Sequence, residues 1–539
     1  MTIPDEAARP YNRAERTPPQ RSARRLSGLD AGFLALELRE QPMHIMAVAV
    51  LRPAADGETS AQITLDDVRR HLARRLNVLP ALRLRVQPVP LGLHHPVFVE
   101  ASDFDLDHHL GSATLPAPGG SQELDRLCAS LAGSCLDRRH PLWHLTLVDG
   151  LIDGRQALVF EVHHCLMDGT AMLTTFARLF AEEDPQPGGR CCGWRPERPP
   201  SRWRLIADAI ANQRGMFAGL PALVRKTRRG RAVICQSTAG SSIAVPRPGA
   251  DAPACSLNLG YTPERRFARA SLSLADVKLV TDVAGVSVND VVLSVVAGAL
   301  RDYLEQRHVL PNRPLVANVP VGMKTPGDPA RAVGNRFTRL ATSLATDMGD
   351  PWARLQTISA VTRESKRRLD LMGREVLGEW LDFLPPAITC AVVRRGYRRR
   401  RSHPDHLDTN VTISNIRGPA RPWCFGSAVV DEMYVSAPPN SGVGVTFVMW
   451  DYAGTLLVGI LSFADSVADP GELAGGLSRS LSELVTIARC RRGSSASLAG
   501  GSACNVRPVT GEAAGTGTGT GTAIRLATAG THVAGGDRL

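Results

Sequence analysis

The sequence has few aromatic residues and no long uninterrupted apolar run. Phe, Trp and Tyr make up 5% of the 539 residues, so aliphatic side chains must provide most of the core packing. A membrane-spanning helix needs about 20 consecutive apolar residues. The best candidate, residues 288–300, is interrupted by Asn289, Asp290 and Ser294. The sequence therefore predicts no spanning helix, and any membrane contact is expected to be peripheral.

The 11 cysteines form no recognisable pattern. The sequence has no Cys-x-x-Cys, and Cys191 and Cys192 are the only close pair. Residues 1–25 contain Arg, Pro and Glu but no apolar segment of the kind found in a secretory signal peptide. Disulfide frameworks are typical of short secreted chains. We therefore expect a reducing, cytoplasmic setting.

Acidic residues are outnumbered by basic ones, which gives a formal net charge of +11 and a pI near 9.4. Such a balance favours an anionic partner. Nucleic acid, anionic lipid headgroups and the phosphates of CoA all fit this description. No recognised nucleic-acid-binding motif accompanies the charge, so we do not expect nucleic acid as a partner.

Length and composition indicate a globular, mixed α/β protein with two domains. A chain of 539 residues exceeds one ordinary core, and 43% hydrophobic with 21% charged residues is typical of globular proteins. Both ends lack apolar periodicity, and a Pro-, Arg-, Ser- and Gly-rich stretch lies between the two periodic regions. The predicted divisions are a disordered arm (1–25), an N-terminal domain (26–187), a linker with a helical segment (188–263), a C-terminal domain (264–492) and a disordered tail (493–539).

A run of seven residues, 163–169 (HHCLMDG), lies where a strand pattern gives way to a helix pattern. Residues 143–147 alternate apolar and polar, and residues 157–163 read as a second strand after a Gly-containing turn. Apolar residues then recur at helical spacing from Leu173 to Phe180. The histidine pair is therefore expected at the end of a strand, followed by a short turn into a helix.

The second predicted domain repeats the alternation of helix and strand patterns. A buried helix is expected at 288–303, and strands are expected at 315–321, 411–416, 443–450 and 456–463. In front of that helix, Ser287 and Asp290 have the spacing of an N-terminal capping pair, which favours a structural role for Asp290. Asn289 then lies in the first turn, where its amide could reach a site between the domains.

Two adjacent histidines at a strand end point to opposite faces, so one can face a channel while the other packs inside. A neutral imidazole, with an ordinary pKa of about 6.5, suits proton abstraction from an alcohol at physiological pH. Asp168 is close enough in sequence to fix the local geometry. Gly169 is expected to allow a tight turn into the helix.

Other roles for the same residues are open. A metal site would need further ligands, and the pairs His108-His109 and His140 with His144 lack the spacing of helical ligands, so no metal site is expected. Cys165 could act as a nucleophile, although its direction on the strand is wrong for activation by His164. Two buried histidines can also be purely structural.

Further motifs occur in order on both sides of the histidine run. They are residues 26–34 (LSGLDAGFL), 42–44 (PMH), 104–110 (FDLDHHL), 136–138 (LDR), 141–143 (PLW), 289–290 (ND), 334–335 (GN) and 414–419 (SNIRGP). The histidine run resembles the signature of the CoA-dependent acyltransferase superfamily, which includes chloramphenicol acetyltransferase. The ordered set resembles the bacterial wax ester synthase/diacylglycerol acyltransferase family from Leu26 to about Ile487.

The resemblance implies two chloramphenicol-acetyltransferase-like domains, each a mixed sheet with flanking helices, and an active site in the channel between them. It implies direct attack of an acceptor hydroxyl on the thioester of a long-chain acyl-CoA, without an acyl-enzyme or a cofactor. His164 would be the general base, supported by His163, while Asp168 and Gly169 would hold the loop. Asn289, Asn415 and Arg417 are the candidates for substrate binding in the second domain.

The implied product is triacylglycerol when diacylglycerol is the acceptor, or a wax ester when it is a fatty alcohol. A specialised, polyketide-type alcohol is a related alternative. A catalytically silent lipid-binding or lipid-droplet protein on the same scaffold is a different one, although a coat function would not need the intact histidine run.

Two basic stretches, residues 225–231 and 394–401, each follow an apolar segment. Such a combination is how a protein lies on an anionic bilayer without spanning it, although an ordinary solvated charge run has the same composition. We therefore expect a cytoplasmic protein peripherally associated with the inner membrane face or with lipid droplets.

Overall fold

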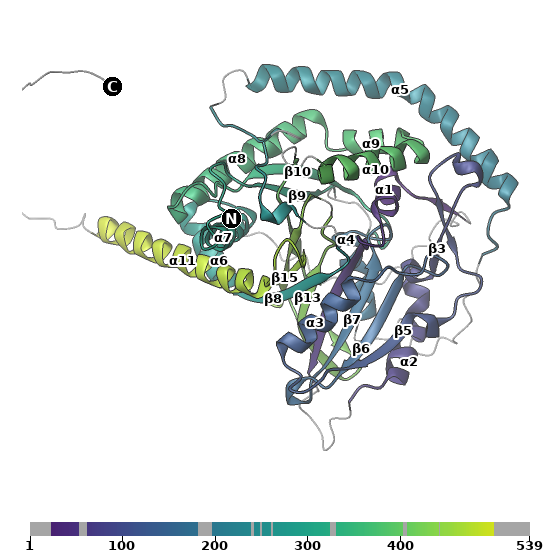
Figure 1. Ribbon diagram of the computed structural model, residues 1–539, viewed down its shortest axis with the longest axis horizontal. Helices are drawn as coiled ribbons and strands as arrows, with labels where there is room; N and C mark the ends of the chain where they lie inside the picture. Colours follow the sequence, from purple (N-terminus) through teal and green to yellow (C-terminus); the bar gives the residue numbers. More distant parts are fainter. Residues whose placement is uncertain are drawn as a thin grey trace, which may run out of the picture. The chain divides into compact units, whose positions relative to one another are not determined.

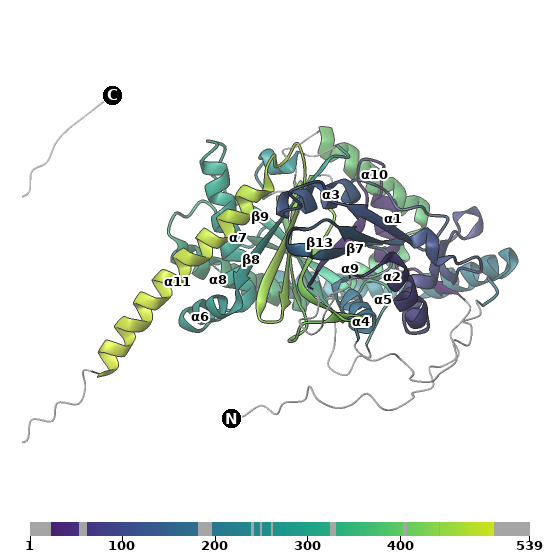
Figure 2. The same cartoon turned by 90° about the horizontal axis from the view of Figure 1, so that it is seen from below.

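The computed structural model describes residues 23–52, 62–181, 197–238, 242–247, 251–259, 262–323, 330–402, 407–440 and 442–500. Most of the predicted N-terminal arm and of the C-terminal tail, together with Cys191 and Cys192, lies outside these ranges. Residues Met1–Arg491 belong to one unit by their internal contacts. Within it, two six-stranded sheets each carry their own core, as the α/β prediction requires (Figures 1 and 2).

The first sheet holds the histidine run and has the strand order β12-β13-β2-β7-β6-β5. The bounds are Cys424–Phe425 (β12), Ala428–Ser436 (β13), His44–Arg52 (β2), Gln156–His163 (β7), Trp143–Asp149 (β6) and Leu110–Thr114 (β5). All neighbours are antiparallel except β5 and β6. β12 and β13 come from the predicted C-terminal domain, so the two halves are joined through main-chain hydrogen bonds.

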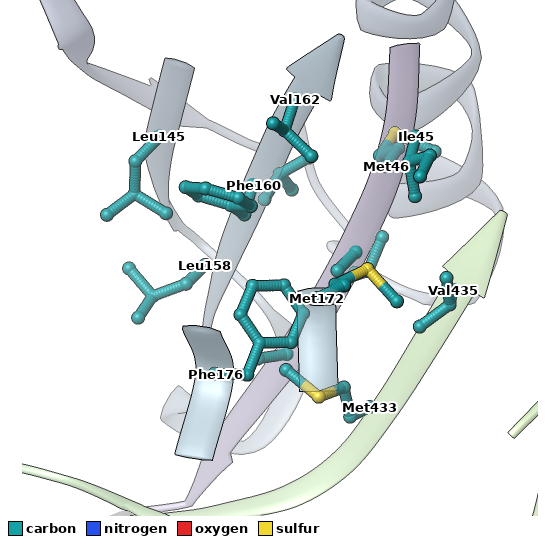
Figure 3. Close-up of a cluster of buried hydrophobic side chains, with 14 of the residues drawn as sticks. Ile45, Met46, Leu145, Leu158, Phe160, Val162, Met172, Phe176, Met433 and Val435 are labelled. Carbon is teal, nitrogen blue, oxygen red and sulfur yellow. The ribbon is translucent and has the colours of Figure 1, made fainter. Parts of the chain in front are cut away.

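Strands β2 and β7 are buried over nearly their whole length, because both faces of the sheet are covered. Helix α4 (Gly169–Leu179) buries Met172 and Phe176 against this sheet. Figure 3 shows these two side chains among Met46, Phe160 and Met433. The predicted apolar stripe of α4 was partly wrong, since Ala177 is exposed.

The second sheet has the order β10-β9-β11-β14-β15-β8. Its strands are Phe337–Ser343 (β10), Val316–Gly322 (β9), Val411–Arg417 (β11), Val445–Tyr452 (β14), Thr455–Phe463 (β15) and Arg265–Ser273 (β8). β11 is parallel to both of its neighbours. The helices of the second core lie on one side of this sheet in Figure 2; they are α6 (Leu274–Ala284), α7 (Val288–Glu305), α8 (Pro351–Met372) and α11 (Pro470–Gly500).

A small third sheet includes the start of the described chain. Its order is β1-β4-β3, with bounds Arg24–Arg25, Val97–Glu100 and Leu84–Gln87. Arg24 and Arg25 were placed in the disordered arm, which was wrong: they pair with Phe98 and Val97. At the other end, α11 continues to Gly500, beyond the predicted start of the tail.

The remaining helices surround the first sheet and link the two cores. They are α1 (Gly28–Leu36), α2 (Leu65–Arg75), α3 (Ser121–Ala132), α5 (Arg202–Thr238), α9 (Val376–Phe383) and α10 (Pro386–Ser402). α9 and α10 both contact α1, as Figure 1 shows. The predicted linker helix is α5, which is longer than expected and continues through the basic stretch 225–231 rather than ending before it.

None of the described helices is long and apolar enough by itself to cross a membrane. Two bent pairs satisfy the length and composition criteria only when joined. One is α6 with α7, at an angle of 107°, and the other is α9 with residues 386–399 of α10, at 113°.

Candidate active site

The loop from β7 to α4 is fixed by main-chain bonds on both sides of the histidine pair. The amide of His163 donates to Leu142 O at 2.9 Å, and the amide of His164 donates to Met43 O at 2.8 Å. Asp168 is the N-cap of α4, and its Oδ1 accepts from Ala171 N at 2.9 Å. The predicted strand, turn and helix around the histidine run are therefore confirmed.

The imidazole of His164 contacts aromatic side chains of both halves. It stacks on Phe33 of α1, with ring centroids 3.9 Å apart and an interplanar angle of 7°. Phe337 of β10 lies 6.1 Å away on centroids. Desolvation lowers the pKa of His164 to about 4, against opposing contributions from its own carbonyl, from Asp168 and from Asn335. The ring is therefore neutral at physiological pH.

Asn335, which sequence reasoning did not single out as a site residue, holds one ring nitrogen of His164. Its Oδ1 lies 3.1 Å from His164 Nδ1, and its Nδ2 donates to His164 O at 2.7 Å. Within the described ranges, no group hydrogen-bonds to His164 Nε2, and the side chain is partly exposed. The only sequence signal was its place in the GN motif at 334–335.

Asp168 makes no hydrogen bond to the His164 ring; while its Oδ1 caps α4, its Oδ2 binds the loop 331–336 from the other half. Its Oδ2 accepts from Arg331 Nη2 at 2.6 Å and from the amide of Arg336 at 2.8 Å. The amide of Asp168 donates to Gly334 O at 3.3 Å. These are the contacts of a structural support, and they bring Asn335 to the histidine.

Gly169 is the first residue of α4, and its φ is not in the left-handed region. A Cβ at this position would lie 2.7 Å from Ile416 Cδ1. The expected reason for this glycine, a tight turn, was therefore wrong. A larger residue here would have to displace the side chain of Ile416 in β11, so close packing rather than a turn accounts for this glycine.

His163 faces inward and is fully buried. Its Nδ1 accepts from Cys165 N at 3.0 Å, and its Nε2 lies 3.2 Å from Glu37 Oε1. Neither atom of this second contact has a partner that meets hydrogen-bond criteria among the described residues. Burial favours a raised pKa for Glu37, yet His163 and Arg138 lower it to about 2. Glu37 is thus an anion placed behind the histidine pair.

A second buried pair, His44 and Glu161, lies beside His163 and was also missed from sequence. His44 is the cross-strand partner of His163, and its Nε2 lies 3.3 Å from Glu161 Oε1 without hydrogen-bond geometry. Desolvation lowers the pKa of His44 to about 4 and raises that of Glu161 to about 7. Between these values both groups are neutral, which explains how the sheet buries them.

The structure gives little support to a cysteine nucleophile or a metal site at these residues. Cys165 is fully buried, and desolvation raises the pKa of its thiol, so a thiolate nucleophile is disfavoured. Among the described residues, no group of three or more His, Cys, Asp or Glu side chains has the arrangement of a metal site. His109 packs on Trp143 and bonds its carbonyl at 2.9 Å, which is a structural role.

The three substrate-binding candidates of the second half make no contact with His164. Asn289 lies in the first turn of α7, and its Nδ2 is buried without a hydrogen-bond partner among the described residues. The capping box of Ser287 and Asp290 is present as predicted. Asn415 and Arg417 are exposed near the end of β11. Side chains alternate along a strand, so both point away from the face on which Ile416 meets Gly169. Their role in substrate binding stays a prediction.

Comparison with known proteins covers almost the whole described chain. Residues 26–292 match the wax ester synthase/diacylglycerol acyltransferase catalytic domain, and residues 333–485 match the C-terminal domain of the same family. A protein of Mycobacterium tuberculosis H37Rv named as a diacylglycerol O-acyltransferase is 34% identical over 454 residues, 84% of this chain and 94% of the relative. A second one, tgs2, is 34% identical over 464 residues, 84% of this chain and 97% of the relative.

Solved structures give the same picture of the fold. The wax ester synthase/diacylglycerol acyltransferase from Marinobacter aquaeolei VT8 superimposes with a TM-score of 0.57 at 26% identity, covering 86% of this chain and all of that one. The first condensation domain of the CDA synthetase superimposes with a TM-score of 0.50 at 16% identity, over 86% of this chain and 96% of that one. The second likeness concerns the fold alone.

Proposed function

Because the chain belongs to the wax ester synthase/diacylglycerol acyltransferase family, we propose that it transfers a long-chain acyl group from acyl-CoA to the free hydroxyl of diacylglycerol, giving triacylglycerol. The observation that carries the mechanism is the state of His164: its Nδ1 faces Asn335 Oδ1 at 3.1 Å, while Nε2 has no protein partner within the described residues. A neutral imidazole with a free ring nitrogen can take a proton from a hydroxyl group and so act as a general base.

The reaction needs one proton to move and no covalent intermediate on the protein. His164 Nε2 takes the proton of the acceptor hydroxyl as its oxygen attacks the thioester carbonyl. The tetrahedral intermediate collapses, the C–S bond breaks, and the proton passes from His164 to the departing sulfur. The products are an ester and free CoA. General-base help of this kind contributes on the order of 10²–10⁴ in rate.

The surroundings of His164 suit this step. Phe33 covers one face of the ring and Phe337 lies beside this stacked pair, so the base is largely desolvated and stays unprotonated. Asp168, held by Arg331, keeps the loop of the second half in place. No resident cofactor is required for the proposed chemistry, and dialysis against EDTA is expected to leave turnover unchanged.

The test is direct. The purified full-length chain is incubated with radiolabelled palmitoyl-CoA and either diacylglycerol or hexadecanol, and the lipids are separated. Labelled triacylglycerol supports the proposal, and labelled hexadecyl palmitate would extend it to fatty alcohols. Lipid binding without any ester product would overturn it in favour of a silent lipid-binding protein.

We also propose that the protein works at an anionic membrane surface or lipid droplet on the cytoplasmic side. The acceptor is insoluble in water, and helices α5 and α10 each present large apolar side chains to solvent. Trp203 is 81% exposed, Phe217 63% and Val392 57%. The same helices carry exposed arginines, among them Arg228, Arg229, Arg394, Arg395, Arg398 and Arg399. Apolar anchors beside positive charge are the pattern of interfacial binding.

Flotation with vesicles tests the membrane proposal separately from catalysis. The wild type is expected to float with vesicles of phosphatidylcholine and phosphatidylglycerol, and to do so less with phosphatidylcholine alone. Replacing Arg394, Arg395, Arg398 and Arg399 by Ser should reduce flotation, whereas replacing Arg39 and Arg266, exposed elsewhere, should not. Equal binding by both variants would contradict the proposed surface.

A further inference from the structure

Asp30 and Asn335 form a buried hydrogen-bonded pair next to His164, although they are 305 positions apart in the chain. Asp30 lies in α1 and is 2% exposed. Its Oδ1 accepts from the amide of Asn335 at 2.8 Å and from Asn335 Nδ2 at 2.7 Å. Its Oδ2 faces Ser27, the N-cap of the same helix. The Asp30 carboxylate is thus satisfied mainly by donors from the loop that carries Asn335.

This pair decides which way the amide of Asn335 points. Burial raises the pKa of Asp30, but its Oδ1 already accepts from the main-chain amide of Asn335 and its Oδ2 from that of Ser27. The side-chain group of Asn335 that faces Oδ1 is therefore the NH₂, which donates to it at 2.7 Å. The same NH₂ faces the carbonyl oxygen of His164, a second acceptor, at 2.7 Å. The Oδ1 of Asn335 is therefore left to face His164 Nδ1. Rotating the amide would place oxygen against two acceptors and lose both bonds.

The orientation of the amide in turn decides the tautomer of the imidazole. Asn335 Oδ1 can only accept, so the nitrogen it faces, Nδ1, must carry the hydrogen. In a neutral imidazole the other nitrogen then has the free lone pair. Asp168 cannot do this work, because its oxygens face Ala171, Arg331 and Arg336.

We propose that Asp30 and Asn335 are positioning residues that fix His164 in the Nδ1–H tautomer and so make Nε2 the base. The assignment of the reaction itself rests on the proposed function, but the tautomer does not. The pair places a neutral amide next to the ring and the carboxyl group of Asp30 one residue further away. This arrangement orients the base without placing a carboxylate on the imidazole.

The tautomer can be measured without any substrate. The full-length chain is labelled with ¹⁵N in its histidine rings, and the His164 signals are assigned by their loss in His164→Gln. The wild type at neutral pH is expected to show hydrogen on Nδ1. Asn335→Leu, which has a similar size and no acceptor, should shift the signals toward the Nε2–H form. Hydrogen on Nε2 in the wild type would overturn the proposal even if every variant failed to fold.

An exchange of the two residues gives the matching kinetic test. Asp30→Asn and Asn335→Asp are each expected to lower kcat by about 10- to 100-fold, with a smaller effect on KM. The first lets the amide of Asn335 rotate, and the second places two carboxylates together. The double variant restores an acceptor at His164 Nδ1 and a donor at position 30, and should recover at least tenfold over either single variant.

The pH profile separates positioning from a merely structural role. The charged or titratable groups around His164 are Asp168 with its partner Arg331, His163 with Glu37 and, through Asn335, Asp30 with Arg24 nearby. In the double variant a carboxylate is next to the ring, which favours the imidazolium, so the acid limb of kcat/KM should move to higher pH. Asn258→Asp is the control, since this buried asparagine contacts Thr409, Gly442 and Asn410 instead. A double variant no better than the singles, with an unchanged acid limb, would contradict the proposal.

Discussion

The Oδ1 of Asn335 lies 3.1 Å from Nδ1 of His164, although the two residues are 171 positions apart in the chain. Asp168, only four positions away from His164, makes no hydrogen bond to the ring. Instead it binds Arg331 and the amide of Arg336, and these bonds hold the loop that places Asn335 next to His164. The proposed site is therefore assembled from both halves, and the aspartate of the histidine run positions the loop 331–336 rather than the ring.

Replacing His164 by Ala should lower kcat/KM for acyl transfer on the order of 10²–10⁴, because the proton acceptor is lost while substrate contacts remain. The loss is measured as labelled ester formed per unit time, with the melting temperature as a check on folding. His108→Gln is the matched control, since that histidine is exposed and contacts Asp105 and His140 rather than His164. Wild-type turnover by His164→Ala would refute the proposed base.

Asp168→Asn should distinguish the two roles of this side chain, which caps α4 and binds Arg331 of the second half. Asn is as good an N-cap as Asp, but it cannot pair with the charge of Arg331. We expect a loss of about 1–3 kcal/mol in the free energy of unfolding, together with reduced activity as the loop 331–336 loosens. Asp168→Ala should cost about 1 kcal/mol more, because the cap is lost as well.

The double variant Asp168→Asn with Arg331→Met tests whether the two side chains act together. If they do, its loss of stability in urea is smaller than the summed losses of the single variants. Strict additivity would mean that the 2.6 Å contact between them contributes nothing to stability.

Gly169→Ala should destabilise the protein by about 1–3 kcal/mol, because the new methyl group would collide with Ile416. Adding Ile416→Ala should restore part of that loss by making room for it. Gly215→Ala provides the control: this glycine lies within α5 with nothing near its Cβ position, so alanine there should stabilise by about 0.5–1 kcal/mol. An equal gain at both glycines would show that the close approach of β11 is unimportant.

Glu161→Gln should change how stability depends on pH. Burial raises the pKa of Glu161 from 4.5 to about 7, so the native state keeps a proton that the unfolded chain releases. The contribution of this group is fully present below pH 4.5 and is lost as pH rises through about 7. Compared with wild type, Glu161→Gln should therefore gain about 1–3 kcal/mol between pH 5 and pH 8.

Urea unfolding at the two pH values measures this difference. Glu40→Gln, at an exposed position, should follow the wild type at both. If Glu161→Gln also follows the wild type, Glu161 is already ionised in the native state, and the neutral pair with His44 is wrong.

The sequence by itself determined the local structure around the histidines and the class of the fold. Alternation ending at His163, a capping aspartate at 168 and a helical apolar pattern are short-range signals, and the strand, the turn and α4 follow them. The capping box at Ser287 and the buried helix behind it are of the same kind. The motifs in their order led to the family.

Only the tertiary structure decided which side chains meet. Asn335, Asp30 and Phe33 reach His164 from segments more than a hundred residues away, and Ile416 explains Gly169 from the second sheet. The pairing of β13 with β2 across the predicted domain border is equally non-local. Periodicity and capping depend on neighbours a few residues apart, whereas these contacts depend on how two sheets pack. For that reason the sequence could name a candidate base, and it could not name the residues that contact it.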